Sequence, residues 1–147
     1  MSTNRPNNLY RTIGAGAVLL AAFVASGCGE SDGRLAVEGT VTFDGQPLPE
    51  GKISFMPLPG TSSPTAGATI SQGKFQVPPE KGLKPGEFEV SINAVRGSGK
   101  KVFDEDAGGM IELEEVYIPD HYNRKTELRA IIKQGEDNQL VYNLTST

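Results

Sequence analysis

Apolar and polar residues alternate along most of the chain beyond residue 34. In segment 35–43, Val37, Val41 and Phe43 fall on one side, and most of the polar residues between them fall on the other. This two-residue period is typical of a strand with one buried face. The period recurs in six later segments, which are 52–58, 66–70, 74–77, 87–94, 126–133 and 139–144. The pattern therefore predicts seven short strands and no helix.

Turn signals separate the predicted strands. Asp44-Gly45 and Gln72-Gly73 each place a glycine, which adopts positive φ without steric cost, between two alternating segments. Short strands with such turns between them predict an all-β fold. We expect a seven-stranded antiparallel Greek-key β-sandwich over residues 35–147. A small closed barrel is the alternative.

The alternation also predicts which side chains form the core. The predicted inward residues are Val37, Val41, Phe43, Ile53, Phe55, Ala66, Ala68, Ile70, Phe75, Val77, Phe88, Val90, Ile92, Ala94, Leu128, Ala130, Ile132, Leu140, Tyr142 and Leu144. Residues 96–114 break the pattern, because they are glycine-rich and basic first and acidic afterwards. We expect this stretch to be a mobile insertion, followed by a short strand-like piece at 115–119.

The first 27 residues have the anatomy of a secretory signal. Arg5 and Arg11 are the only charges before an uncharged run of small apolar residues at 13–24. That run is shorter than the ~20 residues of a membrane span. A positive start, a short apolar stretch and then small residues describe a signal peptide. The sequence therefore predicts that residues 1–27 are removed on export.

The sequence ASGC at 25–28 resembles the bacterial lipoprotein box, with Ala25 where leucine is usual. The resemblance implies that Cys28 carries two or three fatty acyl chains, which anchor a protein stably in a membrane. Cys28 is also the only cysteine, so it cannot form a disulfide within the chain. Residues 28–34 read as a flexible tether, and Gly29 in place of aspartate favours the outer membrane. An ordinary signal or an N-terminal anchor with an incidental cysteine is the alternative.

Four stretches of the predicted domain resemble the carboxypeptidase regulatory-like domains of the transthyretin-like (prealbumin-like) group. They are VEGTVTFDGQPL at 37–48, GKISF at 51–55, GKF at 73–75 and LKPGEFEV at 83–90. Residues 118–128 are similar to the ending of many small bacterial envelope lipoproteins. These motifs mark turns and strand edges. The resemblance therefore implies a seven-stranded sandwich that acts as a non-catalytic accessory or binding module.

The charge balance argues against a nucleic-acid partner. The chain has 14 basic and 18 acidic residues, for a formal net charge of −4, and removal of the signal would take away Arg5 and Arg11. Affinity for nucleic acid comes mainly from basic side chains that neutralise phosphates. Tryptophan is absent. Its absence disfavours sugar binding by stacking, although tyrosine and phenylalanine can also stack.

Few side chains can support catalysis. His121 is the only histidine and follows Asp120 in a predicted turn. A hydrolase in which His121 activates a serine is an open alternative. The segment AVRGSGKK at 94–101 is close to a phosphate loop, but Lys101 stands where a serine or threonine would bind Mg²⁺, and no helix is predicted to follow. We expect no enzymatic activity and no cofactor.

An acidic cluster within residues 96–115 provides the alternative site. Asp104, Asp106, Glu112 and Glu114 carry the oxygen ligands that Ca²⁺ prefers, without a complete calcium-loop pattern. A solvated charged loop is the other interpretation. We expect a membrane-anchored, non-enzymatic lipoprotein of the cell envelope whose sandwich is a structural or protein-interaction module. Binding of Ca²⁺, a carbohydrate or another ligand through residues 96–115 is the alternative function.

Overall fold

The computed structural model describes residues 32–147. The predicted signal at 1–27 and Cys28 lie outside these residues, as does the first part of the predicted tether. Within the described part, no helix is long and apolar enough to span a membrane. The chain there forms strands joined by turns, which confirms the all-β prediction.

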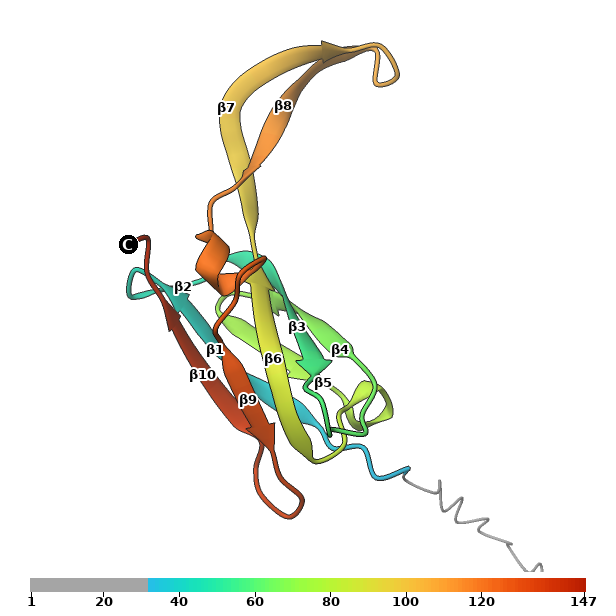
Figure 1. Ribbon diagram of the computed structural model, residues 1–147. Coiled ribbons are helices and arrows are strands. Elements are labelled where there is room, and N and C mark those ends of the chain that lie inside the picture. Colours follow the sequence, from blue (N-terminus) through green and yellow to red (C-terminus); the bar gives the residue numbers. More distant parts are fainter. Residues whose placement is uncertain (1–31) are drawn as a thin grey trace, which may run out of the picture. The chain divides into compact units, whose positions relative to one another are not determined.

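Ten strands and two short 3₁₀ helices make up the described residues (Figure 1). The strands are β1 (Val37–Phe43), β2 (Gln46–Pro47), β3 (Glu50–Pro57), β4 (Ala66–Ser71), β5 (Lys74–Val77), β6 (Gly86–Asn93), β7 (Val95–Asp104), β8 (Gly109–Val116), β9 (Arg129–Ile132) and β10 (Gln139–Leu144). The 3₁₀ helices are η1 (Pro79–Lys81) and η2 (Asp120–Tyr122). The seven predicted strands are all present, as β1, β3, β4, β5, β6, β9 and β10.

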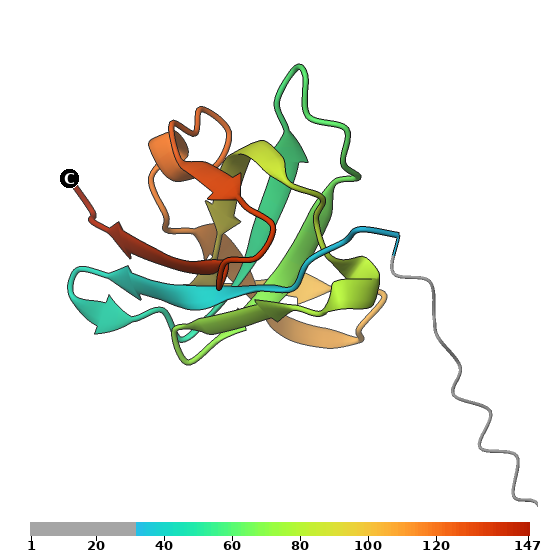
Figure 2. The same cartoon turned by 90° about the horizontal axis from the view of Figure 1, so that it is seen from below.

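One curled sheet contains eight of the strands, in the order β10-β1-β5-β4-β3-β6-β9, with β2 paired to β1. Strands β4 and β5 share a single residue pair, Ser71 with Lys74, so the sheet turns a corner there. Figure 2 shows the resulting sandwich-like body, with β10, β1 and β5 on one side and β4, β3, β6 and β9 on the other. The apolar core lies between these two sides.

The last strand departs from the predicted antiparallel pattern. Strand β10 runs parallel to β1, from Glu38 opposite Gln139 to Phe43 opposite Leu144. The connection 133–138 explains this, because it reverses the chain after β9 and also carries it from one side of the body to the other. Strand β9 stays paired with β6, whereas β10 becomes the edge strand beside β1.

The predicted number of seven strands was wrong, mainly because residues 96–114 are not an irregular insertion. They form most of β7 and β8, which pair with each other and with no other strand of residues 32–147. The remaining additional strand is β2, two residues long, beside the end of β1. Strands β7 and β8 are held by their mutual hydrogen bonds and do not line the core. They therefore lack the alternation that core burial imposes on a sequence.

The core consists largely of the predicted side chains. Most of the predicted inward residues are buried, and the others are half-buried against the core, namely Phe43, Ala68, Leu128 and Leu140. Three more buried side chains lie in connections, where alternation gives no signal: Leu48, Leu83 and Ile118. Full burial of a side chain of this size contributes about 1.5–3 kcal/mol. Within the described residues, the core contains no side chain of β7 or β8.

Gly39 allows β10 and the core to approach β1 closely. A side chain at this position would overlap the carbonyl oxygen of Leu140 and the ring of Phe75. Phe75 is itself buried in the core. The glycine that interrupts the alternation in β1 therefore has a packing role.

Candidate interaction surface

The hairpin of β7 and β8 extends beyond the sandwich-like body (Figure 1). At its base, the Tyr117 amide donates a hydrogen bond to the Ala94 carbonyl at 3.4 Å. The Tyr117 ring meets the Phe43 ring edge-on, with centroids 5.4 Å apart. The Arg96 guanidinium lies 5.1 Å from the centre of the Tyr117 ring, within cation–π range. The hairpin therefore leaves the body at the end where β1 finishes.

A buried asparagine fixes the chain where it returns from the hairpin. Asn123 is 7% exposed, and its side-chain nitrogen donates to the carbonyls of Ile118 and Pro119 at 3.0 and 3.2 Å. Ile118 is buried in the core just after β8. These contacts hold the second strand of the hairpin to the body and make its base a defined junction.

A bulge between Gly97 and Lys101 shifts the register within the hairpin. Before the bulge Gly97 faces Glu114, and beyond it Lys101 faces Glu112. The Glu112 carboxylate accepts a hydrogen bond from the Gly99 amide at 2.9 Å and lies where a side chain on Gly97 would be. The glycine-rich segment whose sequence is similar to a phosphate loop thus binds a carboxylate of the chain itself, that of Glu112. This segment belongs to a strand and is not followed by a helix.

The two strands of the hairpin carry opposite charges. Up to Phe103, the charged residues of β7 are basic, and those of β8 are acidic, namely Arg96, Lys100 and Lys101 on β7 and Glu112, Glu114 and Glu115 on β8. Arg96 and Glu115 form an ion pair at 2.9 Å between exposed side chains. Such an exposed pair contributes under about 1 kcal/mol. Its main effect is to favour the observed alignment of the strands.

Beyond the bulge, the hairpin exposes large apolar side chains on both faces. Residues paired across a ladder share a face. Phe103 pairs with Met110, and the next pair, Val102 with Ile111, therefore lies on the opposite face. Phe103 and Met110 are 65% and 61% exposed. We call these four residues, together with the exposed Leu113, the apolar prong. Exposed apolar groups gathered on one projecting element make it a candidate interaction surface.

The turn at the end of the apolar prong is acidic. Asp104, Glu105 and Asp106 follow one another there. The Asp104 carboxylate accepts a hydrogen bond from the Ala107 amide at 2.7 Å, which stabilises the turn. The hairpin thus combines apolar flanks with a negatively charged tip.

The structure does not gather the four predicted calcium ligands into one site. Asp104 and Asp106 lie at the turn, whereas Glu112 and Glu114 lie along β8. Gly109 is the partner of Asp104, and about 10 Å of strand separates it from Glu112. Among residues 32–147, no three histidine, cysteine, aspartate or glutamate side chains come close enough together to hold a metal ion.

His121 lies exposed on η2. Its ring packs against Tyr122, with centroids 4.0 Å apart. The neighbouring Asp120 forms an ion pair with Arg124 at 2.9 Å. A hydrolase of the serine type needs a base in contact with the nucleophile and oriented by a third group. The contacts of His121 in the described residues do not assemble such a set.

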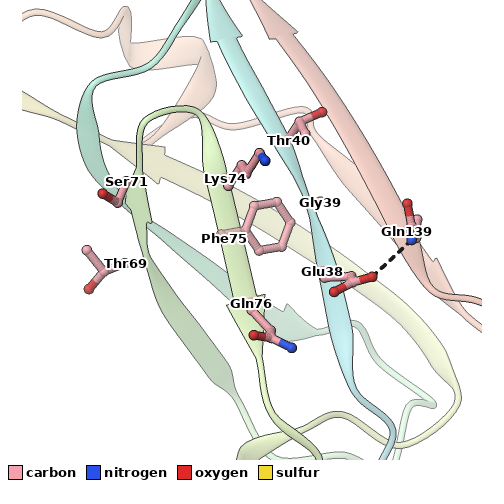
Figure 3. A pocket seen from close by; sticks show the side chains of 9 residues that line it. All are labelled: Glu38, Gly39, Thr40, Thr69, Ser71, Lys74, Phe75, Gln76 and Gln139. Carbon is pink, nitrogen blue, oxygen red and sulfur yellow. Dashed lines mark hydrogen bonds between the residues drawn. The ribbon is translucent and has the colours of Figure 1, made fainter.

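A shallow, open groove of about 620 Å³ runs over β1, β5 and β4 on the outer side of the sheet (Figure 3). Its lining is mostly polar, and the Gln139 side-chain amide donates to the Glu38 carboxylate at 2.9 Å. Phe75 is the one aromatic residue in the lining and is 4% exposed. Sugar rings stack on exposed aromatic faces, which this groove does not offer. The geometry of this groove therefore does not favour sugar binding there, and the carbohydrate alternative predicted for residues 96–115 concerns a different surface.

Comparison of the chain with protein-family models, with curated proteins and with solved structures finds no match.

The apolar prong is not predicted as a surface from the sequence, because composition alone decides the interpretation of residues 96–114. One sequence signal points to it. Two apolar pairs, Val102-Phe103 and Met110-Ile111, flank an acidic, glycine-containing segment of hairpin length.

Proposed function

We propose that this chain is a membrane-anchored, non-enzymatic lipoprotein of the bacterial cell envelope, whose β-sandwich presents the β7–β8 hairpin as a protein-interaction surface. The apolar prong is the observation that carries the interaction role, because Phe103 and Met110 are more than half exposed on an element that adds nothing to the core. The anchor rests on the signal-like residues 1–27 and on Cys28, the only thiol of the chain.

In this proposal the body is a Greek-key sandwich of the carboxypeptidase regulatory-like type. The turn residues of the resembling motifs support it. Asp44 and Gly45 have φ of 49° and 78°, and Gln72 and Gly73 have φ of 49° and 74°. Positive φ at both central residues gives a turn whose twist matches the flanking strands. These turns fit the resemblance, whose motifs mark turns and strand edges.

A binding role fits the described residues better than a catalytic one. The acidic side chains of the hairpin form cross-strand and turn contacts, as Glu115 does with Arg96 and Asp104 with Ala107. His121 stacks on its neighbour Tyr122. Large apolar side chains in solvent, by contrast, have no role within the body. A partner that covers them would gain about 25 cal/mol for each Å² of apolar surface buried.

The interaction role can be tested by shortening the hairpin. In the test variant, an Asn-Gly turn replaces residues 97–114, so that Arg96 and Glu115 close a minimal hairpin. We expect the variant to fold and to reach the membrane, since the core is untouched, but to lose the crosslinked products that the wild-type chain forms in intact envelopes. Glu136→Gln with Asp137→Asn, in the β9–β10 connection, is the matched control and should keep them. Unchanged products in the shortened variant would contradict the interaction role.

A further inference from the structure

The hairpin points away from the end of the domain where the described chain begins. Strand β1 starts at Val37, and its last residue, Phe43, touches Tyr117 at the base of the hairpin. The seven residues of β1 span about 20 Å. The eight residues of β8 add about 25 Å beyond that base. In Figure 1, the blue segment that leads into β1 and the turn between β7 and β8 accordingly lie at opposite ends of the domain.

The apolar side chains on the two faces of the prong set a requirement on its partner. Phe103 and Met110 lie on one face, and Val102 and Ile111 on the other. A flat surface would cover one pair and leave the other in water. An isolated two-stranded hairpin is also only marginally stable in water. A cleft that receives the prong between two apolar walls would cover both pairs and stabilise the hairpin.

The acidic turn favours a protein over a lipid bilayer as the partner that covers the apolar prong. Asp104, Glu105 and Asp106 would enter a bilayer first, and burying unpaired carboxylates in hydrocarbon is strongly unfavourable. A protein cleft with lysine or arginine at its far end would pair these carboxylates instead. Lys100 lies within the bulge, nearer to the body than Val102 and Phe103, and would stay at the mouth of such a cleft.

We propose that the occupant of the prong is a protein with a cleft that has two apolar walls and lysine or arginine at its floor. The proposal rests on the proposed function, and it specifies the partner of the same surface. If residues 28–34 tether the domain to a membrane, the hairpin turn lies at the end of the domain opposite the point where the tether joins it. The partner then approaches from the far side of the domain.

Site-specific photocrosslinking in cells tests this proposal with the full chain. Benzoylphenylalanine is introduced at Phe103 or at Ile111, on opposite faces of the prong. It is introduced in parallel at Val141 and Ile131, which are 67% and 58% exposed on the body. We expect adducts with one and the same protein from both prong positions and none from the two body positions. Adducts from one prong position alone would overturn the cleft.

A charge variant tests the basic floor. Glu105→Gln with Asp106→Asn should lower the yield of both adducts about ten-fold, the effect typical of losing a few charged contacts at an interface. Glu136→Gln with Asp137→Asn, at the other end of the domain, should leave the yield unchanged. An equal yield in all variants would overturn the basic floor.

Other adducts would also overturn the proposal. Twice the mass of the chain would identify a second copy, and a lipid adduct would identify a bilayer. If the prong forms no photocrosslinked adduct but the chemical crosslinks that depend on the hairpin persist, the proposed cleft is wrong and the broader interaction role stands. If neither the adducts nor the chemical crosslinks form, the interaction role fails as well.

Discussion

The Glu112 carboxylate and the Gly99 amide are joined across the hairpin by a hydrogen bond of 2.9 Å. This contact closes the bulge of β7 against β8 at the level where the apolar prong begins. Gly99 has φ of +74°, a conformation that residues with side chains rarely adopt. The glycines of residues 97–99 and the glutamate on the opposite strand thus form one local unit.

Removal of this carboxylate should loosen the prong and leave the body unaffected. Glu112→Ala deletes the acceptor of the Gly99 amide, and a hydrogen bond of this kind contributes about 1 kcal/mol. Amide hydrogen exchange in the far half of the hairpin should then accelerate about five-fold, while the melting temperature stays the same. The control is Glu114→Ala, since its carboxylate makes no hydrogen bond within the described residues. Equal exchange rates in the two variants would contradict the role of Glu112.

Gly39 should be intolerant of substitution. Gly39→Ala places a methyl group against the Leu140 carbonyl and the Phe75 ring, where β10 meets β1. We expect a loss of about 1–3 kcal/mol in the free energy of unfolding, as for other overpacked sites. Urea denaturation measures the loss. Gly109→Ala is the matched control, because nothing lies within 4 Å of a Cβ there and its φ is ordinary. The packing role of Gly39 would be wrong if both variants unfolded at the same urea concentration.

Stability should decline in strongly alkaline solution through Tyr142. Burial raises the pKa of this phenol from its ordinary 10.0 to about 12 in the folded chain. Between those values the unfolded chain releases a proton that the folded chain retains, so unfolding becomes more favourable as the pH rises. The stabilisation is fully present below pH 10 and is lost by up to about 1.4 kcal/mol for each pH unit up to about pH 12.

A titration of stability checks this prediction. The free energy of unfolding, measured between pH 9 and pH 12 in roughly half-unit steps, should fall less steeply for Tyr142→Phe than for the wild-type chain. Tyr122→Phe, at a half-buried tyrosine on η2, serves as the control. Identical slopes for the wild type and Tyr142→Phe would refute the effect of burial.

The sequence predicted the parts of the fold that bury one face of a strand. Seven strands and nearly all core side chains follow from alternation, because burial in a core selects an apolar residue at every second position. The connections carry no such pattern. Leu48 is buried although prolines flank it, and its amide and carbonyl bond to Val41 and Gly73 at 3.0 and 2.7 Å. These long-range contacts cannot be read from local periodicity.

Alternation did not predict the β7–β8 hairpin, because no face of these strands is buried in the core. Its strands are stabilised by pairing with each other, and their apolar side chains face solvent on both sides, so neither burial nor alternation identifies them. The parallel pairing of β10 with β1 was also beyond local sequence. It depends on which side of the body the chain enters after Asn138. The Asn138 side-chain oxygen accepts a hydrogen bond from the Lys133 amide at 2.9 Å, and its backbone carbonyl accepts one from the Glu38 amide on β1 at 3.1 Å. The two apolar pairs around the acidic turn are a local signal for the hairpin, but its exposure as a surface is evident only from the three-dimensional arrangement.

The central claim, that Cys28 anchors this chain, is tested most directly by the mass of the mature N-terminal peptide. The protein is purified from membranes in detergent and digested, and its N-terminal peptide is analysed by mass spectrometry. We expect a peptide that begins at Cys28 and carries a diacylglyceryl group on its sulfur. We also expect Cys28→Ala to be found uncleaved or in the soluble fraction. An unmodified Cys28 in the membrane-bound protein, or normal membrane attachment of Cys28→Ala, would contradict it.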